Sequence, residues 1–112
     1  MTVNDRARII ENVGKLAAKY FSREDLRDLC RDYDIHFNLR STKPNMARSI
    51  VNYWLLNNMT DKIKDVIEGS YDYWQGKIDK KDPHRPGYYV MMRDIAVHSQ
   101  ELMEELKIKA GA

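Results

Sequence analysis

Apolar residues three or four positions apart recur along most of this chain, and this spacing constrains its fold more than any other feature. Residues at that spacing share one face of an α-helix, so each such run predicts a helix with one buried face. No segment alternates polar and apolar residues as a half-buried strand does. The clearest run comprises Met46, Ala47, Ile50, Val51, Trp54 and Leu55.

The same spacing predicts five helices, in residues 3–20, 23–33, 44–55, 60–78 and 88–109. Ser22 is suited to cap the second helix and Thr60 the fourth, because their hydroxyls can accept from backbone N–H groups at a helix start. Pro44 suits the first turn of the third helix. In the first helix, the residues predicted to face inward are Val3, Ala7, Ile10, Val13, Ala17 and Tyr20; in the connection after the second, they are Ile35, Phe37 and Leu39.

The length of 112 residues fits one domain. We expect a compact all-α bundle with a core in residues 1–78, a Pro-rich linker in 79–87 and a C-terminal helix in 88–109. The sequence leaves open whether that last helix packs on its own bundle, on a second copy of the chain or on a partner.

Composition narrows the functional class. The 19 Lys and Arg residues nearly balance the 17 Asp and Glu residues, which gives a net charge of +2, too small for a dedicated nucleic-acid or membrane-surface binder. A single cysteine, Cys30, excludes an internal disulfide and fits a reducing cytosol. The start MTVNDRARII lacks the apolar run of a signal peptide, and no stretch approaches the ~20 apolar residues that span a bilayer. We therefore expect a cytoplasmic chain without membrane contact.

The second predicted helix carries two adjacent ridges of opposite charge. Residues four apart drift by only ~40° around a helix, so its arginines line up beside its carboxylates. One interpretation is a solvated helix with weak ion pairs; the other is a docking surface on which both signs of charge orient a partner. The ridges are formed by Arg23, Arg27 and Arg31, and by Glu24, Asp28 and Asp32.

The runs FSREDLRDLCRDYDI, TKPNMARSIVNYWLLNN and TDKIKDVI, within residues 22–67, resemble bacterial effector-associated, death-like helical adaptor domains. The resemblance implies a helical bundle that docks onto similar bundles and brings sensor and effector proteins of defence or signalling systems together.

Residues 71–89 concentrate aromatic side chains among cations. Tyr and Trp are enriched among interface anchors, so this group is a second candidate partner surface. Cations between aromatic rings also bind single-stranded nucleic acid. A third interpretation is that these rings only pack the last helix onto the bundle. The aromatic candidates are Tyr73, Trp74, Tyr88 and Tyr89, and the cations are Lys80, Lys81 and Arg85.

Residues 26–54 are also similar to helix-extended-helix folds such as SAP and LEM-like domains, in which basic residues contact DNA or a partner. In this chain the contacts would be Arg40, Lys43 and Arg48. This similarity provides the alternative of a small nucleic-acid-binding protein.

Motifs for catalysis are absent from the sequence. No glycine-rich phosphate loop occurs, and His36, His84 and His98 have no metal-ligand spacing. Cys30 lies on an apolar stripe, which indicates a core thiol and not a nucleophile. We therefore expect a non-enzymatic protein-interaction module without metal or cofactor, which binds a protein partner or a second copy.

Overall fold

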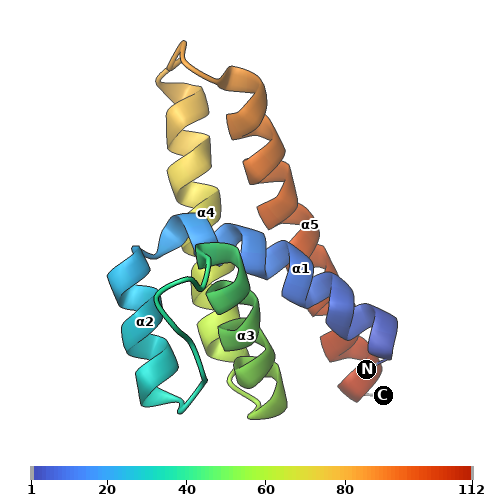
Figure 1. Cartoon of the computed structure of the whole chain (residues 1–112). Helices are drawn as coiled ribbons and strands as arrows, with labels where there is room; N and C mark the ends of the chain where they lie inside the picture. Colours follow the sequence, from blue (N-terminus) through green and yellow to red (C-terminus); the bar gives the residue numbers. More distant parts are fainter. Residues whose placement is uncertain (1, 112) are drawn as a thin grey trace.

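The computed structural model describes residues 2–111, with side chains through Leu106, and its five helices confirm the predicted all-α fold. The helices are α1 (Val3–Tyr20), α2 (Arg23–Asp32), α3 (Lys43–Leu56), α4 (Thr60–Asp79) and α5 (Pro86–Gly111), and residues 2–111 contain no strand. Figure 1 shows α4 and α5 as an antiparallel hairpin whose joined end projects beyond α1.

The first helix is the centre of the fold, because α3, α4 and α5 all pack against it. Gly14 permits the close crossing with α3: a Cβ there would lie 2.7 Å from Cγ of Arg48 and 3.4 Å from its Cα. Gly69 in α4 likewise leaves room for the ring of Tyr20, which would lie 2.6 Å from an added Cβ. The largest fully buried side chains include Ile9, Leu16, Ile50, Trp54, Ile63 and Met92.

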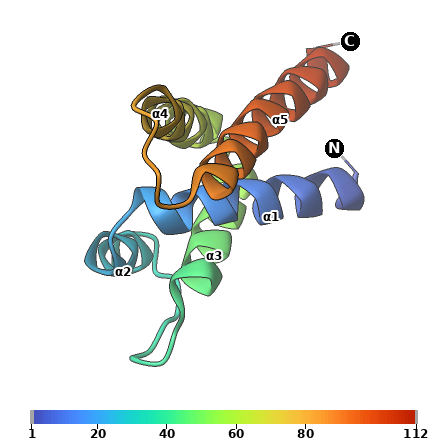
Figure 2. The ribbon, with the colours of Figure 1, turned by 90° about the horizontal axis from the view of Figure 1, so that it is seen from above.

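The fifth helix packs on its own chain. Its N-terminal part lies against α4, whereas its C-terminal part ends on the side of the molecule where α1 begins (Figures 1 and 2). Arg8 of α1 and His98 of α5 lie in contact where these two helices pack, with 3.2 Å between Nη2 and Nε2. The helix begins at Pro86, earlier than the predicted residue 88, because proline is tolerated in a first turn.

The predicted side-chain cap is present at the start of α2 and absent at the start of α4, and α3 also has a side-chain cap. Ser22 forms a capping box with Asp25, and the hydroxyl of Thr42 accepts from the N–H of Asn45. The prediction that Thr60 caps α4 is wrong: Thr60 is the first residue of that helix, after Met59. Only Asn58 and Met59 lie between the C-cap of α3 and the start of α4, and the N–H of Met59 donates to Trp54 to close α3.

Three helices end in Schellman motifs without glycine. Asp34, Asn58 and Lys81 adopt positive φ angles of 56°, 55° and 53° after α2, α3 and α4. In each motif the next residue donates back to the last turn; the N–H of Asp82, for example, reaches the carbonyl of Lys77 at 3.3 Å. Among these three positions Lys81 is the least suited, because Asn and Asp tolerate this conformation better.

Replacing Lys81 by glycine is expected to stabilise the protein by about 0.5–1 kcal/mol, because glycine removes the Cβ strain of the left-handed conformation. The matched control is Lys80→Gly, one residue earlier, where φ is −78° and glycine should only destabilise. Urea unfolding followed by circular dichroism compares the two variants. A Lys81→Gly protein no more stable than Lys80→Gly would contradict the assignment of strain.

Several residues predicted to be buried are exposed. Val3 is 85% exposed, Leu39 is 87% exposed and Tyr20 is 47% exposed, and Ala7 also faces solvent. The first turns of α1 have an apolar face that the neighbouring helices do not cover. Val13 and Ala17 are buried as predicted, and Ile35 and Phe37 pack against the core as expected for the connection.

Candidate functional site

The second helix lies at the edge of the fold. It packs against α3, and no helix-to-helix contact joins it to α4 or α5 within the described part of the chain. Trp54 holds its C-terminal end, because the indole N–H donates to the hydroxyl of Tyr33 at 2.9 Å, and Tyr53 stacks on Tyr33 with ring centroids 4.3 Å apart. The opposite side of α2 is left to solvent.

The predicted arginine ridge on α2 exists, but its members differ in their contacts. A guanidinium N–H of Arg23 donates to the carbonyl of Ser41 at 2.9 Å, which fastens the end of the connecting loop to the start of α2. Arg31 pairs with Asp28 at 2.8 Å and lies over the ring of Phe37, with 5.3 Å between Cζ and the ring centroid. These two arginines therefore hold two separate parts of the connecting loop, at Ser41 and at Phe37, against α2.

Arg27, in the middle of the ridge, is half-buried, and its Nε has neither solvent contact nor a hydrogen-bond partner. No ion pair between Arg27 and a carboxylate occurs among the described residues. Because no described carboxylate pairs with this guanidinium, it is the member of the ridge best placed to gain from a carboxylate on a partner, at its terminal nitrogens and not at the shielded Nε.

The acidic ridge lies beside the arginines and is exposed along its length. Glu24 and Asp32 face solvent and form no ion pair with another described residue. Asp28 pairs with Arg31, and each of these two side chains is 60% exposed. Exposed pairs of this kind contribute at most ~1 kcal/mol. We name this surface the α2 charged face, formed by Arg23, Glu24, Arg27, Asp28, Arg31 and Asp32.

The aromatic group divides into buried and exposed members. Trp74 and Tyr89 are only 7% and 9% exposed, and their rings stack with centroids 5.8 Å apart, so they hold α5 on α4. Tyr88 meets Trp74 edge-on at 5.5 Å and is half-buried. Tyr73 is 56% exposed and also meets Trp74 edge-on. Only Tyr73 and Tyr88 of these four therefore present ring surface to a partner.

Cations do surround these exposed rings. Arg85 lies over Tyr88 at 4.2 Å, and Lys77 lies 5.7 Å from the centroid of Tyr73. Lys80 and Lys81 are exposed in the turn between α4 and α5. Of the three cations predicted to accompany the aromatic rings, Arg85 is the one that lies over a ring in the described part of the chain.

An ionised carboxylate lies among these cations and weakens their field. Asp82 Oδ1 accepts from the backbone N–H of His84 at 3.0 Å and lies 2.9 Å from its ring Nδ1, and these bonds hold the pKa of Asp82 at about 2. Its other oxygen lies 3.6 Å from Nζ of Lys77. The cluster is therefore less suited to bind phosphates than its lysines alone suggest.

The second set of predicted nucleic-acid contacts does not form one patch. Arg48 lies beside Gly14 of α1, pairs with Glu11 at 3.6 Å and hydrogen bonds to Asn45. Lys43 is five residues earlier, about 140° away around α3. Arg40 is exposed in the connecting loop.

The remaining candidates for catalysis or metal binding are the cysteine and the possible metal ligands. Cys30 is fully buried, as predicted, and burial raises the pKa of its thiol. No group of His, Cys, Asp and Glu within the described residues is placed to hold a metal ion. No helix in the described part of the chain has both the length and the apolarity to cross a membrane.

Comparisons with known proteins identified no relatives: no family model, curated protein or solved structure matches this chain.

One further surface was not predicted from the sequence. It is a groove between α4 and α5, and it depends on which faces of two separate helices meet. Exposed apolar residues next to carboxylates, such as Tyr71 beside Asp72, are the only sequence signal that could have indicated it.

Proposed function

We propose that this protein is a non-enzymatic helical module that docks onto another protein through the α2 charged face. The observation that carries the proposal is Arg27, a half-buried guanidinium without a carboxylate partner among the described residues, at the centre of an exposed face. A carboxylate from a partner would pair with the terminal nitrogens of this guanidinium, and charge-assisted hydrogen bonds of this kind are stronger than neutral ones.

The α2 charged face is held rigidly, which lowers the cost of binding. The capping box of Ser22 and Asp25 holds the start of α2, the Schellman motif at Asp34 closes its end, and Arg23 fixes the adjacent loop. A surface ordered before the encounter loses less conformational entropy on association. Charges of both signs on such a surface favour one orientation of the partner over others.

An adaptor role in bacterial defence or signalling, and a place in the cytoplasm, belong to this proposal because the resemblance of residues 22–67 implies them. The partner on this interpretation is another helical bundle, including a second copy of this chain. The alternative, nucleic-acid binding through Tyr73, Tyr88 and the surrounding cations, is supported by Arg85 and Lys77 over the rings but opposed by Asp82 among them.

Site-specific photocrosslinking tests the proposal in the cells that make the protein. Glu24 is replaced by the photoreactive residue p-benzoylphenylalanine, and Asp61 by the same residue as the control. Both are exposed acidic residues in the first turn of a helix, α2 for Glu24 and α4 for Asp61, so the two substitutions should affect stability similarly.

We expect a discrete covalent adduct from position 24 and none of that size from position 61. An adduct at twice the mass of the chain identifies a second copy as the partner, and any other mass a different protein. No adduct from position 24, or equal adducts from both positions, would contradict docking through α2.

A further inference from the structure

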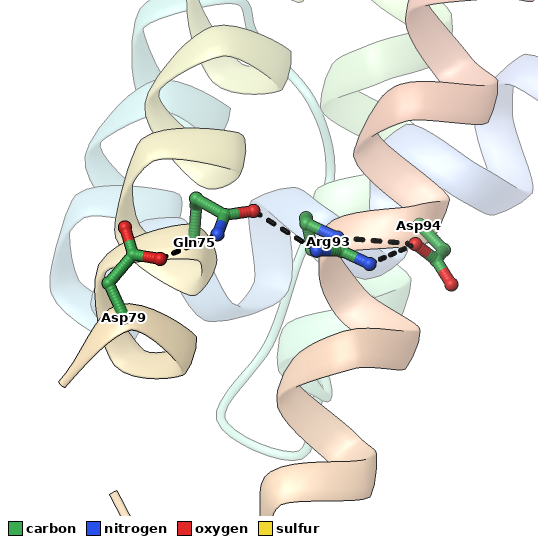
Figure 3. A network of polar contacts seen from close by, with 4 residues as sticks. All are labelled: Gln75, Asp79, Arg93 and Asp94. Carbon is green, nitrogen blue, oxygen red and sulfur yellow. Dashed lines mark hydrogen bonds and ion pairs between the residues drawn. The ribbon is translucent and has the colours of Figure 1, made fainter. Parts of the chain in front are cut away.

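The hairpin of α4 and α5 contains a polar clamp on one side. Arg93 of α5 donates to the side-chain oxygen of Gln75 in α4 at 3.1 Å, and the amide of Gln75 donates to Asp79 at 2.9 Å (Figure 3). Arg93 is held in turn by Asp94 on its own helix. This clamp fixes the spacing of the two helices near their joined end.

A groove of about 490 Å³ lies one helical turn beyond the clamp. Its α5 side comes from residues that follow Arg93 by one to two turns, where that helix runs toward α1 (Figure 1). The groove is apolar at its base, because Ile67 and Ala96 are 2% and 1% exposed. Tyr71 and Val97 form apolar walls, each 38% exposed.

The rim of the groove is acidic. Glu68 and Asp72 stand one turn apart on α4, and Glu101 stands opposite on α5. Basic side chains approach this rim only at long distance: Nζ of Lys64 lies 3.9 Å from Glu68, Nδ1 of His98 lies 3.9 Å from Glu101, and all four side chains are more than half exposed. No ion pair to Asp72 occurs among the described residues.

An unsatisfied acceptor lies at the same place. The side-chain oxygen of Gln100, which lines the groove, is shielded from solvent and has no hydrogen-bond donor among the described residues, while its amide nitrogen donates to Glu104. The groove therefore combines an apolar base, three carboxylates and a carbonyl oxygen, and each of these polar groups accepts hydrogen bonds or attracts cations. A Lys or Arg side chain of a partner pairs with the exposed carboxylates, whereas the shielded oxygen of Gln100 is reached only after a shift of its own side chain.

We propose that this groove binds a basic amphipathic helix of a partner protein. An apolar side chain of that helix fills the space between Tyr71 and Val97, and cations one turn to either side meet the acidic rim. The spacing fits, since Glu68 and Asp72 are separated by about 6 Å along α4, which is also the separation of lysines four apart on a bound helix. Amphipathic helices whose apolar residues recur every three or four positions commonly bind in hydrophobic grooves.

This surface is distinct from the α2 charged face, which is cationic at its centre, so the proposal does not rest on docking through α2. The two surfaces would also select opposite partners. A carboxylate satisfies Arg27, whereas carboxylates on the groove's occupant would be repelled by Glu68, Asp72 and Glu101.

The test uses two fluorescein-labelled peptides and the full chain. Both peptides carry leucines at every third or fourth position to form one helical face; the other positions are lysine in the first peptide and glutamate in the second. Fluorescence anisotropy measures binding to the wild-type protein, to Val97→Lys and to Val90→Lys. Val90 is the matched control, because it lies on the same helix with the same 38% exposure but outside this groove.

We expect the lysine peptide to bind and the glutamate peptide not to bind. Val97→Lys should weaken binding at least tenfold, because it places a cation in the apolar wall beside the rim, whereas Val90→Lys should change it less than twofold. Arg27→Glu, on α2, should leave peptide binding unchanged. Far-ultraviolet circular dichroism confirms that the variants fold.

Other outcomes overturn the proposal. Equal binding of both peptides would show general hydrophobic adsorption, and equal effects of Val97→Lys and Val90→Lys would place the peptide elsewhere. No binding of the lysine peptide would exclude a basic helix as the occupant. If sedimentation equilibrium shows a dimer that Val97→Lys disrupts, the occupant is a second copy of the chain.

Discussion

Replacing Trp54 by alanine is expected to destabilise the protein by about 3–5 kcal/mol, the range observed for removal of a large aromatic side chain from a core. Trp54 is 2% exposed and packs near Phe21, with ring centroids 6.4 Å apart. Its loss also leaves the hydroxyl of Tyr33 without its donor. Small domains have only about 5–15 kcal/mol of stability in total, so the variant should be close to unfolding.

The conservative variant separates the two contributions of Trp54. Trp54→Phe keeps an aromatic ring in the core but removes the hydrogen bond to Tyr33, so we expect a loss of about 1–2 kcal/mol. Urea unfolding followed by circular dichroism at 222 nm measures both variants. A loss below about 1 kcal/mol for Trp54→Ala would show that Trp54 does not join α3 to α2 as the structure indicates.

Reversing the charge of Arg27 to glutamate is expected to reduce the adduct formed from position 24 at least tenfold, which corresponds to about 1.4 kcal/mol of binding free energy. The reversal replaces the guanidinium, which would pair with a carboxylate on the partner, by a carboxylate that repels the partner's carboxylate. Stability should fall by only about 1 kcal/mol, because the introduced glutamate would gain Arg31 one turn later while the packing of the arginine stem is lost.

Two further variants control this result. Arg27→Met keeps an apolar stem of similar length without charge, so it should retain stability but still lose most of the adduct. Arg6→Glu makes the same charge reversal on an exposed part of α1, far from α2 in the chain, and should leave the adduct unchanged. Normal adduct yields with Arg27→Glu would exclude Arg27 from the interface.

Sequence periodicity predicted the helices well because each buried stripe is a local property of the chain. The continuation of α4 through Gly69 is an example: the stripe from Ile63 to Trp74 continues past the glycine, and the glycine is used for contact with Tyr20. Periodicity indicates which residues share a face, however, and not how much of that face a neighbouring helix covers. Val3 and Leu39 are exposed for this reason.

The candidate sites were predictable to different extents. The ridges of the α2 charged face follow from helical geometry alone, but the difference between Arg27 and its neighbours arises from the loop that returns past Arg23 and Arg31. The burial of Trp74 and Tyr89 depends on the pairing of α4 with α5. The groove between those helices also forms only when α4 and α5 pair, and this pairing cannot be predicted from a single sequence.

The chemical nature of the adduct formed from position 24 tests the central claim most directly. Half of the crosslinked sample is treated with nuclease and half with a protease before electrophoresis under denaturing conditions. If α2 docks onto a protein, the adduct keeps its size after nuclease treatment, and proteolysis releases crosslinked peptides that include residues of the partner. An adduct that nuclease shortens to the chain with only a few crosslinked nucleotides attached would contradict a protein-docking module and establish a nucleic-acid binder.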